Sequence, residues 1–171
     1  MPPVRTLTPG HVVVHPNRER SACRLTKAAV VSVLLASAGL ILVVTIGGWS
    51  ELQGMQLVDL LWSIAYVVLA LYIWRWARGL LPIAAVLAVL MLAFAAIATL
   101  GLDGTSWFAR GSPGYAAPRS LFGGAGLSTG LLGALTVLLI ALEAALAAIA
   151  MVAFSQRWNV ELEVPEAERR G

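Results

Sequence analysis

Charged residues are scarce in this chain. They make up only 12% of its 171 residues, about half the share of an average soluble domain, while hydrophobic residues make up 59%. A soluble domain needs more polar surface to cover its core, and a disordered chain needs more charge and fewer aliphatic residues. Both classes are therefore excluded, and an integral membrane protein is the class that remains.

Cysteine and histidine, which hold most disulfides and metal sites, are almost absent. The single cysteine, Cys23, cannot form an internal disulfide or a thiolate cluster, so we expect a free thiol. The two histidines, His11 and His15, are too few for a closed zinc site. The sequence also has no P-loop, no HExxH motif and no CxxC motif. We therefore expect no catalytic residue, no metal, no cofactor and no enzymatic activity.

Long apolar runs are what the chain has in abundance. Crossing the hydrocarbon core of a bilayer takes about 20 apolar residues in a helix. Four runs reach that length and are apolar on every face, as lipid requires. They predict an all-α integral membrane protein, a four-transmembrane-helix bundle. The predicted spans are 28–48, 56–76, 80–102 and 131–154, in a transmembrane domain 28–154 that has an outer loop 103–130 and is flanked by tails 1–27 and 155–171.

Positive charge is distributed unevenly between the two sides of this predicted bundle. Ten of the 12 lysine and arginine residues lie in the two tails and in the turn between the second and third spans, while only Arg110 and Arg119 lie in the outer loop. Cytoplasmic segments of membrane proteins carry the excess of lysine and arginine. We therefore expect a multi-pass protein of the cell (plasma) membrane with both termini cytoplasmic (N-in/C-in), whose partner is the lipid bilayer and not nucleic acid.

Tryptophans mark the ends of the predicted spans. Five of the six flank a span end: Trp49, Trp74, Trp76, Trp107 and Trp158. Indole rings prefer the headgroup layer of a bilayer. We therefore expect these side chains to anchor the bundle in the membrane and to have no ligand role.

The connecting segments predict local contacts. Gly79 and Pro82 in the turn ARGLLP favour a tight hairpin, which makes the second and third spans antiparallel neighbours. In the tails, HVVVHP at 11–16 and NVELEV at 159–164 read as extended segments, which pair either with each other or with a partner's sheet edge. The loop 103–130 is rich in glycine, and we expect a partly ordered segment at the membrane surface, with a ligand-binding lid as the alternative.

Glu143 is the one ionisable residue near the middle of a predicted span. It lies about 18 Å into the fourth span at 1.5 Å per residue, where a charged side chain costs on the order of 3 kcal/mol to insert. It should therefore face other helices, and because no lysine or arginine lies inside a span, we expect it to be protonated. Ser37 and Tyr66 lie at nearly the same depth, so a Glu143–Tyr66–Ser37 cluster is expected, either as an interhelical tie or as a proton or cation site.

Asp59 is the second carboxylate of the predicted spans. It lies in the first turn of the second span, close to the outer interface, where the helix dipole favours a negative charge. Asp59, Ser63 and Tyr66 share one helical face and form a polar stripe that leads toward the depth of Glu143. The stripe is interpreted as a helix cap with two packing hydroxyls, and a proton path is the alternative.

Two function classes follow. The first is a non-catalytic accessory or interaction component of the cell membrane, in a homo-oligomer or a larger membrane complex. The second is a small proton-coupled transporter or channel that uses Glu143. The first is favoured, because transporters usually show more polar groups inside the membrane, broken helices or internal repeats, and the sequence has few of these.

Overall fold

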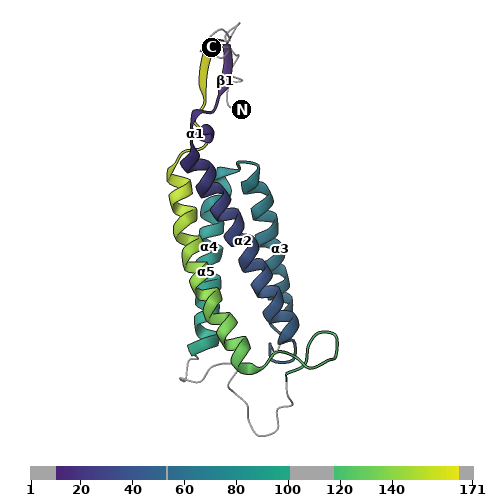
Figure 1. The fold of residues 1–171 in the computed structure, drawn as a ribbon. Coiled ribbons are helices and arrows are strands. Elements are labelled where there is room, and N and C mark those ends of the chain that lie inside the picture. The colour runs from purple at the N-terminus through teal and green to yellow at the C-terminus, as the bar shows by residue number, and fades with distance from the viewer. Residues whose placement is uncertain (1–10, 53, 101–117, 166–171) are drawn as a thin grey trace.

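The computed structural model describes residues 11–52, 54–100 and 118–165. Over these ranges the chain is mostly helical, and four of its helices are long and apolar enough to cross a membrane, as predicted. The elements are β1 (His11–Val14), α1 (Pro16–Glu19), α2 (Ser21–Gly47), α3 (Gln56–Trp74), the 3₁₀ helix η1 (Arg78–Leu80), α4 (Leu81–Leu100), α5 (Thr129–Ser155) and β2 (Leu162–Pro165). The four long helices run side by side, with both strands at one end (Figure 1).

The first long helix starts earlier than its apolar run. α2 begins at Ser21, well before residue 28, so Arg24 and Lys27 lie on the helix. Hydropathy marks only the part of a helix that lipid can surround, whereas the backbone hydrogen bonds of the helix can continue beyond it through polar residues that water or other side chains satisfy. Here Thr26 supplies one such partner, because its hydroxyl donates to Gln156 beyond the end of α5.

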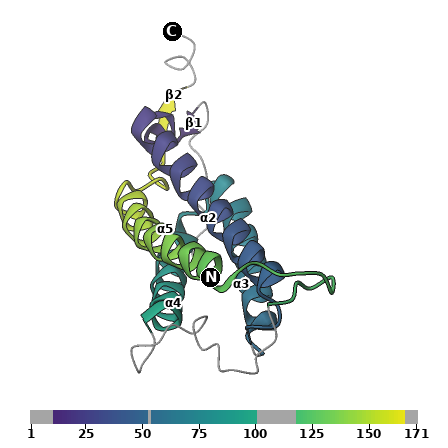
Figure 2. The same ribbon diagram turned by 60° about the horizontal axis from the view of Figure 1, so that its bottom comes forward.

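The order of the helices in the bundle differs from one expectation. α2 packs along both α3 and α5, and α4 packs along α5, while α3 and α4 share few contacts (Figures 1 and 2). The prediction that the second and third spans are close neighbours is therefore wrong for most of their length. The short turn ties only their ends together, whereas the buried alanines of α4 let it approach α5 closely. Those alanines are Ala84, Ala85, Ala88 and Ala95.

A pair of tryptophans closes the bundle at the end that carries both strands. Trp158 is fully buried, and its ring meets Trp76 edge-on at a centroid distance of 5.3 Å. Its indole N–H donates to Gln156 Oε1 over 3.0 Å, and the same oxygen accepts from Thr26 Oγ1 over 2.6 Å. The prediction that Trp158 anchors in the headgroup layer is therefore wrong, because this ring serves as core between α2 and the turn after α3.

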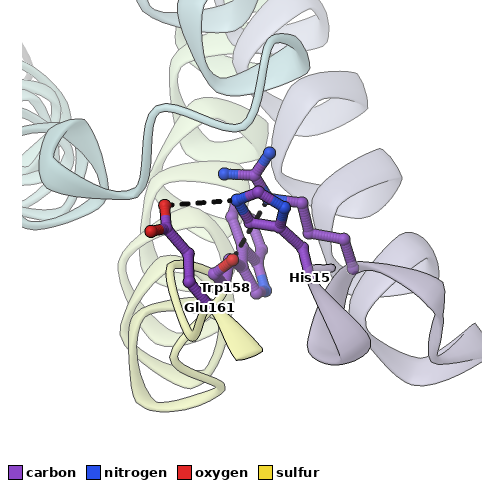
Figure 3. Close-up of polar contacts among 4 residues, drawn as sticks. His15, Trp158 and Glu161 are labelled. Atoms are coloured by element: carbon purple, nitrogen blue, oxygen red, sulfur yellow. Dashed lines mark hydrogen bonds and ion pairs between the residues drawn. The ribbon is translucent and has the colours of Figure 1, made fainter. Parts of the chain in front are cut away.

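The two tails pair with each other, which confirms this alternative over pairing with a partner's sheet edge. β1 and β2 form an antiparallel ribbon in which Val12 lies opposite Val164 and Val14 opposite Leu162. A two-stranded ribbon alone is marginal in water. In this protein the base of the ribbon carries an additional contact between the two tails, in which His15 Nε2 lies 3.4 Å from Glu161 Oε1 (Figure 3).

The base of the ribbon is also tied to the end of α5. Arg18 Nε donates to the carbonyl oxygen of Trp158 over 3.1 Å (Figure 3). Asn17 Nδ2 donates to the carbonyl oxygens of Gln156 and Arg157. These carbonyls follow the last turn of α5, where a helix leaves carbonyl groups that need partners from outside it. The N-terminal tail therefore caps the C-terminal helix.

At the other end of the bundle, residues 118–128 cap α2. The backbone N–H groups of Leu121 and Leu127 donate to the carbonyl oxygens of Ile46 and Gly47, over 3.0 and 2.8 Å. This is the described part of the outer loop, and the expectation for residues 103–117 lies outside the described residues. The segment is thus ordered by bonds to a helix end.

Gly126 lies where this segment crosses α2 most closely. A Cβ built on it would contact the carbonyl oxygen of Gly47 and would lie 2.9 Å from the carbonyl group of Pro118, both of which are backbone. We expect Gly126→Ala to lower the free energy of unfolding by about 1–3 kcal/mol, because backbone has to shift. Thermal unfolding in detergent, followed by circular dichroism, measures this. Gly130→Ala is the control, since nothing lies within 4 Å of its Cβ; equal stability of the two variants would contradict the expectation.

Candidate functional site

The polar cluster at mid-bundle is built by three helices. Ser37 of α2, Tyr66 of α3 and Glu143 of α5 are all fully buried. Tyr66 Oη donates to Glu143 Oε2 over 2.7 Å, and Ser37 lies close enough to interact with the same carboxyl group. α3 and α5 share few other contacts, so the Tyr66–Glu143 bond joins two helices that α2 otherwise separates.

Hydrogen-bonding capacity is left over in this cluster. Among the described residues, Ser37 Oγ, Glu143 Oε1 and Trp62 Nε1 are buried and have no hydrogen-bond partner of good geometry. Trp62 lies one turn before Tyr66 on α3 and close to its hydroxyl. An unpaired buried polar group costs about 1–3 kcal/mol. A proton on Glu143 Oε1 gives the carboxyl a donor for the Ser37 oxygen, so a neutral acid suits this site better than a carboxylate.

Asp59 lies apart from this cluster, about 10 Å along α3 from Tyr66 at 1.5 Å per residue. Its Oδ2 accepts a hydrogen bond from Thr45 Oγ1 of α2 over 3.3 Å. Ser63, between Asp59 and Tyr66, donates to the backbone carbonyl oxygens of Asp59 and Ala38. The polar stripe exists, but its hydroxyl in the middle bonds to the backbone and does not link the two carboxyl groups.

Asp59 instead lines a cavity of about 370 Å³. All four long helices contribute to its wall, which lies in the half of the bundle away from the strands. Asp59 and Thr136 are the polar residues of this wall, and the other lining side chains are apolar. Leu139 lies on the wall one turn before Glu143, and Glu143 itself does not line it. Sequence reasoning missed this cavity, because no periodicity in the chain marks a gap between helices.

The cationic side chains at the end with the strands are engaged in structure. Lys27 Nζ lies 4.0 Å from the centroid of the Trp76 ring and donates to the Trp74 carbonyl oxygen over 3.2 Å. Arg78 Nε donates to the carbonyl oxygen of Phe154 over 2.9 Å, and its guanidinium lies over the ring of that residue. These two basic side chains therefore stabilise the ends of the helices.

One short motif bears on the expectation that the chain has no catalytic residue. Residues 126–130 read GLSTG, which matches the G-x-S-x-G spacing of a serine nucleophile. In the structure Ser128 is the N-cap of α5, and its hydroxyl accepts from the backbone N–H of Leu131 over 3.3 Å. Both histidines lie at the opposite end of the bundle, because His11 is in β1 and His15 directly precedes α1; Figure 1 shows these two elements there. In the structure this serine therefore acts as a helix cap, with neither histidine near it.

The described residues contain no group of three or more histidine, cysteine, aspartate or glutamate side chains that could hold a metal ion. Comparisons with models of protein families, with curated proteins and with solved structures found no match for the chain. Two features of the structure therefore bear on function: the buried Glu143–Tyr66 pair and the apolar cavity beside Asp59.

The Tyr66–Glu143 hydrogen bond can be tested directly. We expect Tyr66→Phe to lower the free energy of unfolding by about 1–2 kcal/mol, because it leaves a second oxygen of Glu143 without a partner inside the bundle. Unfolding of the purified protein in mixed micelles measures this loss. Tyr72→Phe is the matched control, since Tyr72 lies on the same helix with about half of its surface exposed. No difference between the two variants would refute the structural role of the bond.

Proposed function

We propose that this chain is a non-catalytic component of the cell membrane, with both termini in the cytoplasm, that acts by holding other membrane components. It contributes a rigid bundle of four helices and performs no chemistry of its own. The observation that carries this proposal is the burial of Glu143. Its carboxyl group is enclosed by the helices, and one of its oxygens accepts a hydrogen bond from Tyr66.

A working proton site needs access from water. Glu143 is fully buried and does not line the cavity, and Ser63, the hydroxyl between Asp59 and Tyr66, donates to backbone carbonyl oxygens. No relay therefore joins Glu143 to Asp59 through the described residues. A carboxyl group enclosed in this way fits an interhelical tie, which specifies how the helices pack.

The faces of the helices that point outward are apolar. α3 alone exposes Leu57, Leu61, Ile64 and Leu71, each by more than half of its surface. Such faces suit lipid, and they equally suit a second copy of the chain or another membrane protein. We propose the lipid bilayer as one partner and a homo-oligomer or a larger membrane complex as the other.

A second candidate function is a small proton-coupled transporter or channel. One observation favours it: the cavity beside Asp59 ends one helical turn from Glu143. A rearrangement of that single turn would bring Glu143 to the wall of the cavity that Asp59 lines. This function requires Glu143 to exchange its proton with water.

The proposed orientation rests on the arginine and lysine residues. Arg18, Arg24, Lys27 and Arg78 all lie at the end of the bundle that carries the strands, and cytoplasmic ends carry such residues. We expect a fluorescent protein fused after residue 171 to fluoresce and alkaline phosphatase fused at the same place to be inactive. The reverse pattern would show that the bundle is inserted the other way. Fusions within the outer loop, after residue 110, are the control and should behave oppositely.

Replacing Glu143 separates the two candidate functions. Glu143→Gln keeps an oxygen that accepts from Tyr66 but has no proton to release, whereas Glu143→Leu has neither. We expect Glu143→Gln to unfold within about 1 kcal/mol of the original protein and Glu143→Leu to lose about 2 kcal/mol or more. Proteoliposomes carrying a pH gradient should show no proton flux above empty liposomes with any of the three proteins.

The outcome that overturns the proposal is equally specific. Proton flux through the original protein that Glu143→Gln abolishes, at unchanged stability of the bundle, would establish the transporter. Loss of stability in Glu143→Gln equal to that in Glu143→Leu would show that the carboxyl group has a role beyond accepting the hydrogen bond.

A further inference from the structure

The cavity between the four helices has the properties of a small-molecule site. Its volume of about 370 Å³ lies in the range of ligand pockets, which are mostly apolar and carry a few polar groups that orient the ligand. It extends from the end of the bundle, at Leu52 and Met55, down to Leu139 in α5. Side chains from α2, α3, α4 and α5 line this half-open space.

The charge of the wall narrows the choice of ligand. Asp59 is the one ionisable residue of the described wall, and none of the described lysine, arginine or histidine residues forms an ion pair with it. Its carboxyl group receives a hydrogen bond from Thr45 over 3.3 Å, which is long and leaves most of its accepting capacity free. A carboxylate beside an apolar cavity attracts a cation strongly, because little water screens the pair.

The remaining lining fits a cation with an apolar body. Phe94 contributes an aromatic ring, a group that can attract a cation, and Met55 and Met91 contribute flexible thioether side chains that adapt to different shapes. Thr136 donates its own proton to the carbonyl oxygen of Leu132 over 2.8 Å, so its oxygen is available to accept from a ligand N–H. An anionic ligand would meet the Asp59 charge with no basic group nearby in the described wall.

We infer that this cavity binds a lipophilic cation, whose positive charge pairs with Asp59 while its apolar body fills the space between the helices. The ligand class is a free organic ammonium or phosphonium compound. The phosphate of a bilayer phospholipid is disfavoured by the charge of Asp59, and a plain acyl chain would leave that carboxylate unpaired. This inference goes beyond the proposed role of the bundle and does not depend on Glu143.

The test uses two ions of the same shape and opposite charge. Tetraphenylphosphonium and tetraphenylborate are added at pH 8 to the full chain in lipid nanodiscs, with binding measured by isothermal titration calorimetry against empty nanodiscs. We expect saturable binding of the phosphonium cation and none of the borate anion. We expect Asp59→Asn, which keeps the shape of the side chain, to weaken phosphonium binding at least tenfold.

Two further variants keep the result interpretable. Glu161→Gln removes one negative charge from the described ribbon end and should leave phosphonium binding unchanged. Ala98→Leu fills part of the cavity while keeping Asp59, and it should weaken binding by a similar factor as Asp59→Asn. Circular dichroism of each variant in the same nanodiscs verifies that the bundle is folded.

Three results overturn the inference. The first is no saturable binding of the cation. The second is equal binding of both ions, which means unspecific partition into apolar surface. The third is a lipid that native mass spectrometry finds retained equally by the original protein and by Asp59→Asn, which would assign the cavity to a lipid chain.

Discussion

One constraint applies to any bundle whose helices are long and apolar enough to cross a membrane, as these four are: inside a bilayer, polar groups have to find partners within the protein, and lipid supplies no hydrophobic force that drives helices together. The chain meets this with one strong tie at mid-depth and close packing elsewhere. Tyr66 reaches from α3 to Glu143 on α5, while the alanines of α4 settle against α5. The polar pair links α3 to α5 across the bundle, and the small residues let α4 approach α5 closely.

At the ends of the bundle polar groups do not need partners within the protein, because water and lipid headgroups can satisfy them. Each end is nevertheless closed by the protein's own backbone and side chains. At one end Trp158 is buried beneath Arg18 and Gln156, and at the other the segment 118–128 donates to the last carbonyls of α2. Both closures join parts of the chain that are far apart in sequence, so they hold the helix order that the short turn between α3 and α4 does not.

The features that could be predicted from the sequence are those that depend on the regular geometry of a helix. The rise of 1.5 Å per residue allowed the depths of Ser37, Tyr66 and Glu143 to be matched by counting, and the structure brings these three side chains together. Counting could not show which helix lies beside which, since that depends on where small and large residues meet across an interface. Trp158 was misjudged for the same reason: its position in the chain is that of an anchor, and only the approach of Trp76 turns it into core.

The two carboxyl groups show that the surroundings of an acid determine whether it is available to a ligand. Asp59 and Glu143 are the two acids inside the spans, yet Glu143 is enclosed and bonded to a neighbouring helix, whereas Asp59 lines a space with no described cation to neutralise it. The cavity itself has no signature in the sequence, because it arises where α3 and α4 separate while the rings of Trp62 and Phe94 still meet across them at 5.9 Å. The separation that contradicts the expected hairpin packing therefore also leaves room for the ligand that we propose, and Asp59, interpreted as a helix cap in the sequence, is the residue proposed to select the charge of that ligand.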